Sequence, residues 1–188
     1  GTLTSEDALI RAKDVEEMTG HFLMFNEMLK TYAEPLSHEL IKRYHYKLKS
    51  GVFEDIANGY PIGEYKNRRN MVSDITTALP EDVHARMTAL LDEYNTKDQQ
   101  DLHGLAKFHA DYEAIHPFQD GNGRTGRLIL FKECLKYHIV PFIIEDDLKL
   151  FYYRGLKEWN NEKGYLTDTC LTAQDRYKAY LDYFRIAY

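Results

Sequence analysis

Apolar side chains recur at every third or fourth position along most of this sequence, a period that predicts amphipathic α-helices. The first expected helix starts from a cap at Thr4 or Ser5 and ends before Pro35. We expect its apolar stripe to face the core, and this stripe consists of Leu9, Ala12, Val15, Met18, Phe22, Phe25 and Leu29. Six further helices are expected, with approximate spans of 37–50, 80–94, 98–115, 124–135, 146–160 and 168–184. The fold class is therefore mainly α.

The helical period fails over residues 51–80. Turn residues punctuate this segment, namely Asn58-Gly59, Pro61 and Gly63. Partly alternating side chains follow them, which predicts a short β-hairpin or an extended flap at about 61–78. A nonhelical segment of this length in a helical domain is usually functional or mobile. Its basic side chains are therefore candidate contacts for a partner, with a solvated basic loop as an equal alternative: Lys66, Arg68 and Arg69.

Composition narrows the classes of function. The chain has 188 residues, and no Pro-, Gly- or Ser-rich tract divides it, so we expect a single domain over 1–188. Its 24 Lys and Arg against 30 Asp and Glu give a net charge of −6, which disfavours general binding to nucleic acids or anionic membranes. Cys134 and Cys170 lie in apolar helical contexts, which favours two buried thiols in a reducing cytoplasm over a disulfide. A site for an anion must therefore be local.

Residues 116–127 concentrate polar chemistry: His-Pro-Phe-Gln-Asp-Gly-Asn-Gly-Arg-Thr-Gly-Arg. Gly121 and Gly123 accept positive φ, so successive backbone N–H groups can line one concavity that binds anions. The helix expected from Arg124 points its free N–H groups and the positive end of its dipole at the same place. Arg124 and Arg127 lie three positions apart and leave the same helix face, where they can grip phosphates. The stretch predicts a polyphosphate site.

Two titratable side chains in this stretch offer further chemistry. The Asp120 carboxylate could hold Mg²⁺, which typically takes one or two carboxylates and completes its shell with water and phosphates. A capping Asp is the alternative for this residue. His116 titrates near neutral pH and could remove a proton from an attacking hydroxyl, with Pro117 and Phe118 fixing its backbone and walling one side. A structural histidine before proline is the alternative here.

Three other interpretations of this stretch are weaker. Gly121, Gly123 and Gly126 match the G-x-G-x-x-G pattern, but a dinucleotide fold needs a strand before it, and here a helix is expected. The partner motifs of a kinase or a P-loop enzyme are absent from the sequence. His109 and His116 would lie about 10 Å apart along a helix, too far to share one metal ion. His109 is better interpreted as a core residue or a support for the site.

Residues 116–127 resemble Fic-domain enzymes, because they match in full the signature H-P-F-x-[DE]-G-N-G-R-x-x-R. The segment from Pro61 to Lys66 is similar to the start of the family's target-binding flap. Tyr153 and Asn160 fall where members with a YY…L…N helix contact adenosine. The resemblance implies the Fic fold, a helical bundle with a small β-hairpin flap over the active site.

The resemblance also implies an activity. Such enzymes transfer AMP from ATP to a hydroxyl of a target protein, a Ser, Thr or Tyr, with Mg²⁺ and release of pyrophosphate, and self-modification is expected here too. The family's catalytic positions are His116 as general base, Asn122 and Arg124, and its metal ligand is Asp120. The implied ATP contacts are Phe118, Gly121, Asn122, Gly123, Arg124, Arg127, Tyr153 and Asn160. The implied flap contacts to the target are Lys66, Met71 and Val72.

Other functions remain open at this point. Phosphate transfer occurs in the toxin branch of the family, where a lysine replaces the residue at Gly123. Removal of AMP would rely on an inhibitory glutamate that this sequence does not show. A nucleotide-binding interaction module without turnover would need the arginines but not His116 or Asp120. A homodimer is one possible assembly.

The start of the chain bears on regulation. Many Fic proteins carry the pattern [ST]-x-x-x-E-[GN], whose glutamate pairs with the second signature arginine, here Arg127. Thr2 to Glu6 has the spacing, but Asp7 replaces the Gly or Asn. In related sequences the motif often runs Ile-Glu-Gly-Asn-Thr-Leu-Thr, and this chain opens Gly-Thr-Leu-Thr. We therefore expect a truncation just after an inhibitory helix.

Overall fold

The computed structural model describes residues 3–5, 8–72 and 75–188. Helices make up most of this part of the chain, and their bounds are α1 Ala12–Thr31, α2 His38–Lys49, α3 Phe53–Ala57, α4 Pro80–Asn95, α5 Leu102–Ile115, α6 Asn122–Lys136, the 3-10 helix η1 Asp146–Leu148, α7 Lys149–Lys157 and α8 Gly164–Tyr183. Two small antiparallel sheets complete it, β1 Leu3–Ser5 with β2 Ala8–Ile10 and β3 Met71–Val72 with β4 Ile75–Thr76. The predicted mainly α fold with a small hairpin is confirmed.

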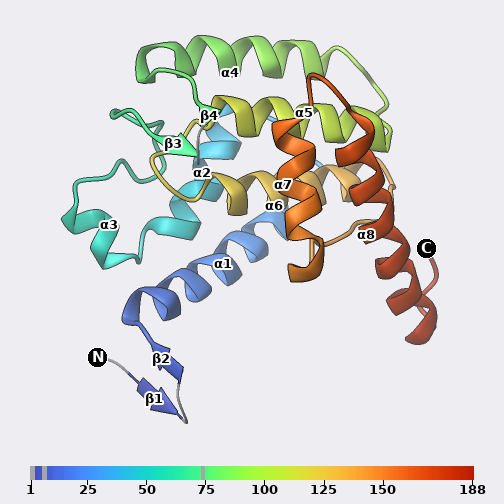
Figure 1. Ribbon diagram of the computed structural model, residues 1–188, viewed down its shortest axis with the longest axis horizontal. Coiled ribbons are helices and arrows are strands. Elements are labelled where there is room, and N and C mark those ends of the chain that lie inside the picture. Colours follow the sequence, from blue (N-terminus) through green and yellow to red (C-terminus); the bar gives the residue numbers. More distant parts are fainter. Residues whose placement is uncertain (1–2, 6–7, 73–74) are drawn as a thin grey trace.

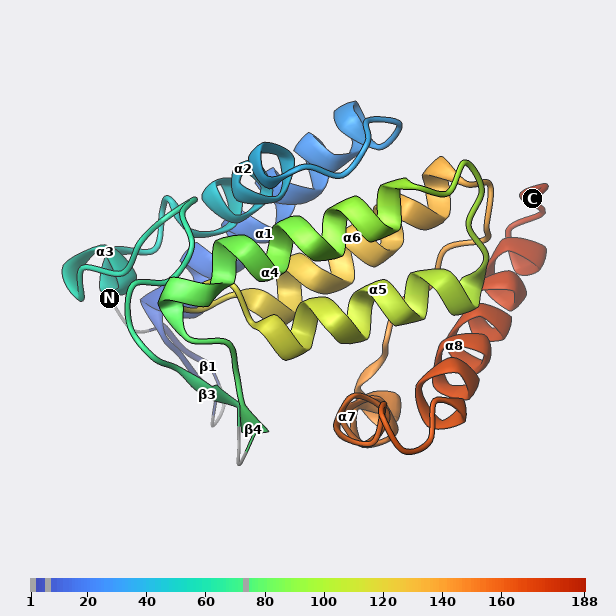
Figure 2. The same cartoon turned by 90° about the horizontal axis from the view of Figure 1, so that it is seen from above.

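Helix α6 lies at the centre of the bundle, in contact with α1, α2 and α5. Figure 1 shows α4, α5 and α6 stacked one below another with α1 beneath them. In Figure 2, α1 and α2 lie on one side of α6, while α7 and α8 gather at the end of the bundle away from α3. The start of α6 therefore lies where several helices can contribute side chains.

Burial of α6 confirms the expectation that it is apolar on more than one face. Leu128, Ile129 and Cys134 are all nearly inaccessible to solvent. Its polar residues Lys132 and Glu133 are buried as well, and their ion pair spans 2.6 Å. Tyr94 of α4 donates a hydrogen bond of 2.8 Å to Glu133, so this buried charge is compensated from a neighbouring helix.

The expectation for the first helix is wrong in two respects. Strands β1 and β2 precede it, so α1 begins at Ala12 rather than behind a cap at Thr4 or Ser5. Its predicted core stripe is also largely exposed, with Phe22 at 60% and Met18 at 56%. The buried face of α1 instead consists of Gly20, Met24, Met28 and Thr31. A Cβ on Gly20 would collide with the backbone of Leu48, so the glycine lets α1 and α2 approach closely.

Smaller differences concern the ends of other helices. Helix α5 is capped by Asp101, whose carboxylate accepts from the Gly104 N–H at 2.8 Å, and not by Asp98. Helix α8 begins at Gly164, four residues earlier than expected. Its predicted apolar side is partly wrong, because Phe184 and Tyr180 are exposed, and the buried residues are Leu166, Thr167, Thr169, Cys170, Ala173 and Gln174.

Two further predictions are tested by burial and by helix length. Cys134 and Cys170 are free and buried, as expected. Within the described ranges, no helix combines the length and the apolar character that crossing a membrane requires.

The hairpin expected at 61–78 is present as β3 and β4, although residues 73 and 74 between them lie outside the described residues. The short helix α3 interrupts the segment expected to be nonhelical.

Candidate active site

The loop between α5 and α6 is shaped by two left-handed residues and one amide side chain. His116 ends α5 at φ 54°, and Gly121 precedes α6 at φ 84°. The buried Asn122 closes the loop from inside, since its Oδ1 accepts from the Phe118 N–H at 2.7 Å and its Nδ2 donates to the Phe118 carbonyl at 2.8 Å. Asn122 therefore fixes the loop conformation, a role that its place in the signature did not reveal.

Helix α2 supports the same loop through His45, which sequence reasoning missed. The His45 ring stacks on Phe118 with centroids 3.9 Å apart. Its Nδ1 accepts from the Gly63 N–H at 2.9 Å, so Nε2 carries the proton that it donates to the Asp120 carbonyl at 2.8 Å. Burial lowers the pKa of His45 to about 4, which keeps the ring neutral. A histidine on an apolar helix face was the only signal in the sequence.

The first turn of α6 forms an anion-binding end of a helix. The first intrahelical bond runs from the Thr125 N–H to the Gly121 carbonyl, so the N–H groups before Thr125 are not used by the helix. Arg127 lies against this turn, because a Cβ on Gly123 would come within 2.9 Å of its guanidinium. Both the dipole and these N–H groups favour a phosphate at this end. Gly121 has the positive φ that was predicted, but Gly123 lies inside α6, which begins at Asn122 rather than at Arg124.

Arg124, the other signature arginine, is held by an acidic side chain from α1. Its guanidinium lies 2.9 Å from one Glu17 carboxylate oxygen and 3.2 Å from the other. Burial raises the pKa of Glu17, but the bonds from Arg124 and Lys49 outweigh that effect and lower it overall. Glu17 was missed because it lies 107 residues from Arg124 in the sequence.

The Asp120 carboxylate contacts the buried ammonium group of Lys49. Lys49 Nζ lies 2.6 Å from Asp120 Oδ2 and 3.0 Å from Glu17, and it also pairs with the buried Asp55. Arg124 lies 3.5 Å from the same Oδ2. Burial raises the pKa of Asp120, but the Lys49 hydrogen bond outweighs it, so the carboxyl stays ionised.

The residues present fit a single magnesium ion. Asp120 is half exposed at the mouth of the loop, and its contacts to Lys49 and Arg124 both use Oδ2, which leaves Oδ1 as a ligand atom. Oxygen atoms of Glu17, Asp55 and Asp120 lie within 4.8 Å of one another, but the Lys49 ammonium pairs with all three carboxylates. Asp120 is thus the carboxylate suited to a cation that also binds phosphates.

His116 lies beside the phosphate-binding turn with its side chain 17% exposed. Burial, followed by the charge of Lys66, lowers the pKa of His116 to about 4. The imidazole is therefore neutral at physiological pH and able to accept a proton. The sequence predicted His116 as a site residue. It did not predict the lowered pKa, which depends on burial at the end of α5 and on the charge of Lys66 in the flap.

The flap is anchored to the loop by buried and half-buried polar groups. Lys66, expected to face a target, is instead buried, and its ammonium donates to Asn70 at 2.6 Å and to Thr77 at 3.0 Å. Asn70 in turn donates to the Phe118 carbonyl at 2.8 Å. Met71 is 73% exposed and Val72 half-buried, and both residues of β4 are exposed, so the two strands form the open part of the flap.

Helix α7 brings a buried tyrosine to the site. Tyr152 forms a hydrogen bond of 2.6 Å with His109, and the Arg127 guanidinium lies 5.6 Å from its ring centre. Its neighbour Tyr153 is exposed, with the two rings 5.3 Å apart, and Asn160 is exposed in the turn after α7. The resemblance had singled out Tyr153, whereas the residue in contact with the signature is Tyr152.

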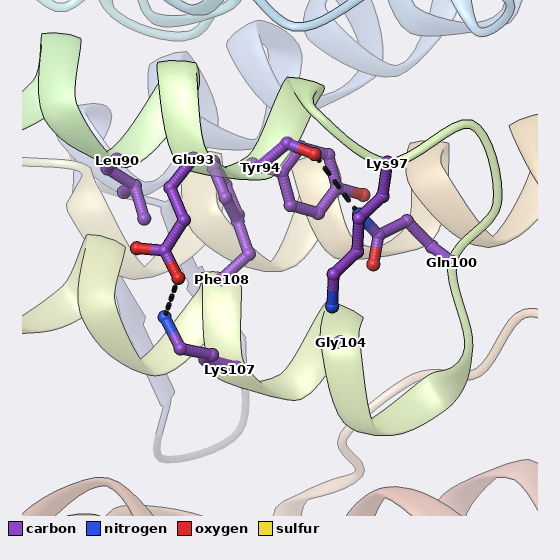
Figure 3. A pocket seen from close by; sticks show the side chains of 8 residues that line it. All are labelled: Leu90, Glu93, Tyr94, Lys97, Gln100, Gly104, Lys107 and Phe108. Carbon is purple, nitrogen blue, oxygen red and sulfur yellow. Dashed lines mark hydrogen bonds and ion pairs between the residues drawn. The ribbon is translucent and has the colours of Figure 1, made fainter.

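Two hollows differ in their relation to this site. One of about 190 Å³ adjoins the arginines and lies between α1, α6 and residues 142–144; its lining includes His21, Phe25, Arg124, Arg127 and Ile143. The other lies between α4 and α5, where Glu93 and Lys107 form an ion pair of 3.1 Å across it (Figure 3). No signature residue lines the second hollow among the described residues, so it is a gap in helix packing.

A left-handed histidine, a glycine-rich turn and a helix start with two arginines lie together at the centre of a helical domain. The chain belongs to the Fic/DOC family, whose model matches residues 35–133. It is 33% identical over 111 residues to Protein adenylyltransferase Fic of Nematostella vectensis, an alignment that covers 56% of this chain and 26% of that relative. The chain thus spans about a quarter of that relative's length.

Solved structures share the fold. A Fic domain containing signaling protein from Bacteroides thetaiotaomicron has a TM-score of 0.72 at 27% identity, over 97% of this chain and 71% of that chain. BepC from Bartonella tribocorum, solved with bound AMPPNP, has a TM-score of 0.61 at 14% identity, over 91% of this chain and 94% of that chain. The helical arrangement around the signature loop is therefore that of Fic domains.

Proposed function

We propose that this chain is a protein adenylyltransferase, which transfers AMP from ATP to a hydroxyl of a target protein. The observation that carries this proposal is the neutral His116 set beside an anion-binding helix start with Arg124 and Arg127. Relatives named protein adenylyltransferase support the type of reaction, and AMPPNP in the related BepC structure supports a nucleotide co-substrate. The choice of the α-phosphorus as the point of attack rests on the family.

The proposed step assigns each group one role. The target hydroxyl gives its proton to His116 while its oxygen bonds to the α-phosphorus. The bond between that phosphorus and the bridging oxygen breaks, and pyrophosphate leaves with the electron pair. Backbone N–H groups of Gly123 and Arg124 at the start of α6, together with the Arg127 guanidinium, stabilise the charge on the phosphates. Asn122 acts through the loop conformation.

Magnesium belongs to this proposal through Asp120. The ion would neutralise phosphate charge when bound. Lys49 and Arg124 hold Oδ2 of the carboxylate, which fixes its orientation before any ion arrives. Tyr153 and Asn160 are proposed for the adenosine end, and they would have to approach the nucleotide from the exposed side of α7.

The proposed protein substrate meets the flap at β3. Met71 and Val72 form a short strand with an exposed and a half-buried side chain, and its edge away from β4 can pair with an extended segment of the target. We further propose a single domain over 1–188, supported by one continuous core, and a reducing compartment such as the cytoplasm, supported by two free buried thiols. We also propose that the protein modifies itself and that it forms a homodimer.

The test is incubation with Mg²⁺ and ATP labelled at the α-phosphate, followed by mass spectrometry of this protein and of added acceptor proteins. We expect AMP on a hydroxyl side chain, and we expect His116→Ala to reduce the rate by roughly 100- to 10,000-fold. Nucleotide binding, measured by calorimetry, should survive in this variant.

Other products would contradict the proposal in different ways. Addition of phosphate alone would indicate phosphate transfer, and loss of AMP from a modified protein would indicate hydrolytic removal of AMP. Binding of ATP without any product would indicate an interaction module. Equal labelling by His116→Ala would exclude the general-base role.

A further inference from the structure

Glu113, one turn before His116 on α5, carries a carboxyl group that the proposed reaction does not use. It is enclosed in the protein, with its side chain 10% exposed. Its Oε1 atom is buried and has no hydrogen-bond partner among the described residues. A carboxyl group in such a place is costly unless another group takes a proton from it or gives one to it.

Two histidines face this carboxyl from the same helix. His116 Nδ1 lies 3.8 Å from Glu113 Oε2, and His109 Nε2 lies 4.0 Å from Oε1. His109 is committed to Tyr152 of α7 through its hydrogen bond of 2.6 Å. His116 Nδ1, by contrast, is buried without a hydrogen-bond partner in the described part of the chain. The unsatisfied ring nitrogen of His116 therefore lies nearest Oε2 of the Glu113 carboxyl, while the unsatisfied Oε1 lies on the side of His109.

Helix α6 leaves room for the carboxyl in this position. A Cβ at Gly126 would come within 2.5 Å of Glu113 Oε1 and within 2.9 Å of the Tyr112 ring. Only a residue without a side chain can occupy position 126 while Glu113 keeps this orientation. Gly126 lies inside the signature, between Arg124 and Arg127, so the same helix turn shapes the phosphate site and the carboxyl slot.

The distance from Nδ1 to Oε2 exceeds that of a hydrogen bond, but it is one that a small rotation closes. In free enzymes such contacts are often long and shorten when the substrate is bound. A histidine that acts as a base through Nε2 needs its proton on Nδ1, and a carboxylate facing Nδ1 selects that tautomer. The same carboxylate stabilises the imidazolium that forms when Nε2 accepts a proton.

We propose that Glu113 is the positioning residue for His116: its carboxylate accepts a hydrogen bond from Nδ1–H, leaves Nε2 free as the base, and stabilises the imidazolium during transfer. This inference rests on the proposed function. The base His116 and the carboxylate of Glu113 that orients it then lie within one helical turn at the end of α5.

The protonation of Glu113 gives the inference a signature in pH. Burial raises the pKa of Glu113 to about 7, although the charge of Arg127 opposes this. The other groups that face the pair are His109 and Tyr112 on α5, Tyr152 on α7, Lys66 at the base of the flap and Asp120 in the loop. The carboxylate form, which the proposed role needs, prevails only above that pKa. We therefore expect kcat to rise as pH increases through about 7.

Three variants of the full chain separate charge, acceptor and fold. Glu113→Gln keeps an acceptor for Nδ1 without the charge, and Glu113→Met removes both at similar size. Asp111→Asn is the matched control, because Asp111 is on the same helix and pairs with Lys107 at 2.9 Å instead. We expect Glu113→Met to lower kcat roughly 10- to 100-fold, which is the range typical of residues that orient a metal-bound histidine through its other ring nitrogen. Glu113→Gln should recover part of that loss, but its kcat should not rise through neutral pH.

A second measurement does not depend on turnover. In protein with ¹⁵N-labelled histidine, the His116 signals, assigned by their loss in His116→Ala, report which ring nitrogen carries the proton. We expect the Nδ1–H tautomer in the wild type and a shift towards Nε2–H in Glu113→Met only. An unchanged tautomer in that variant would show that the Glu113 carboxylate does not set the tautomer and would overturn the inference. Absence of AMP transfer by the wild type would overturn the proposed function, while the tautomer would still test Glu113.

Discussion

At the scale of single residues, the site is built on charges that compensate one another before any ligand binds. The Lys49 ammonium, 1% exposed, pairs with Glu17, Asp55 and Asp120 from three different parts of the chain. Burial lowers the pKa of Lys49, yet these three carboxylates outweigh that effect and keep it raised. The lysine therefore stays charged and neutralises Asp55, which is fully buried, while it orients Asp120 for the site.

This arrangement predicts a large loss of stability on removal of the lysine. Lys49→Met leaves the buried Asp55 carboxylate without its closest cation, and breaking a buried pair in this way costs about 3–5 kcal/mol. The free energy of unfolding from urea denaturation would measure the loss. Lys47→Met, two residues earlier on α2 and partly exposed, is the matched control and should change stability by less than about 0.5 kcal/mol. Similar losses in both variants would contradict the role of Lys49 as compensating charge.

Residue patterns close together in the sequence were informative, and those brought together by folding were not. A turn at Gly121 and a following helix with Arg127 in its first turns were predicted because the glycines and the arginine spacing lie within twelve positions, although the left-handed His116 and the helix start at Asn122 were not. The supporting residues Glu17 and His45 were not, because their roles depend on how α1 and α2 pack against the loop. No local pattern in the sequence reports that packing.

At the scale of elements, α1 shows how a helical period can be recognised while its buried face is assigned wrongly. The apolar stripe that includes Met18 and Phe22 has the right spacing for a core face. The face that packs on α2 contains Gly20, which a hydrophobicity pattern ranks low but which permits the close helix contact. Periodicity reports that a face exists, whereas steric fit decides which face a neighbour covers.

The two methionines of α1 provide a direct test of its orientation. Met24 is fully buried and Met18 is 56% exposed. We expect Met24→Ala to cost about 2–5 kcal/mol, because it leaves a cavity between α1 and its neighbours. Met18→Ala should stay within about 0.5 kcal/mol, since it removes a side chain already in water. Both values come from urea denaturation, and a larger loss for Met18→Ala would restore the stripe as the core face.

At the scale of the whole molecule, one helix pair carries most of the proposed chemistry. Helix α5 supplies His109, Glu113 and His116, and α6 supplies Asn122 and the phosphate-binding turn, while the flap and α1, α2 and α7 contribute from outside. The concentration of histidines in this buried region links the site to global stability. His45, His109 and His116 are all kept neutral by burial, which is the main cause of their lowered pKa values.

These groups predict that stability decreases as pH falls below about 6.5, the ordinary pKa of histidine. Their pKa values in the folded protein are about 4, 3 and 4, so between pH 6.5 and 4.5 these three histidines take up three protons in the unfolded chain that they do not hold in the folded chain. Burial also lowers the pKa of His21 and His38, which adds to this difference. Glu113 opposes them, because its pKa near 7 makes the folded chain hold one proton that the unfolded chain releases above about 4.5. For these three histidines and Glu113, the net difference of two protons corresponds to a slope of about 2.7 kcal/mol per pH unit.

Urea denaturation from pH 7 to 5 would measure this slope in the free energy of unfolding. His109→Gln should reduce the slope by about one proton, with His103→Gln, exposed on the same helix, as the control; an equal reduction in both variants would contradict the assignment of His109.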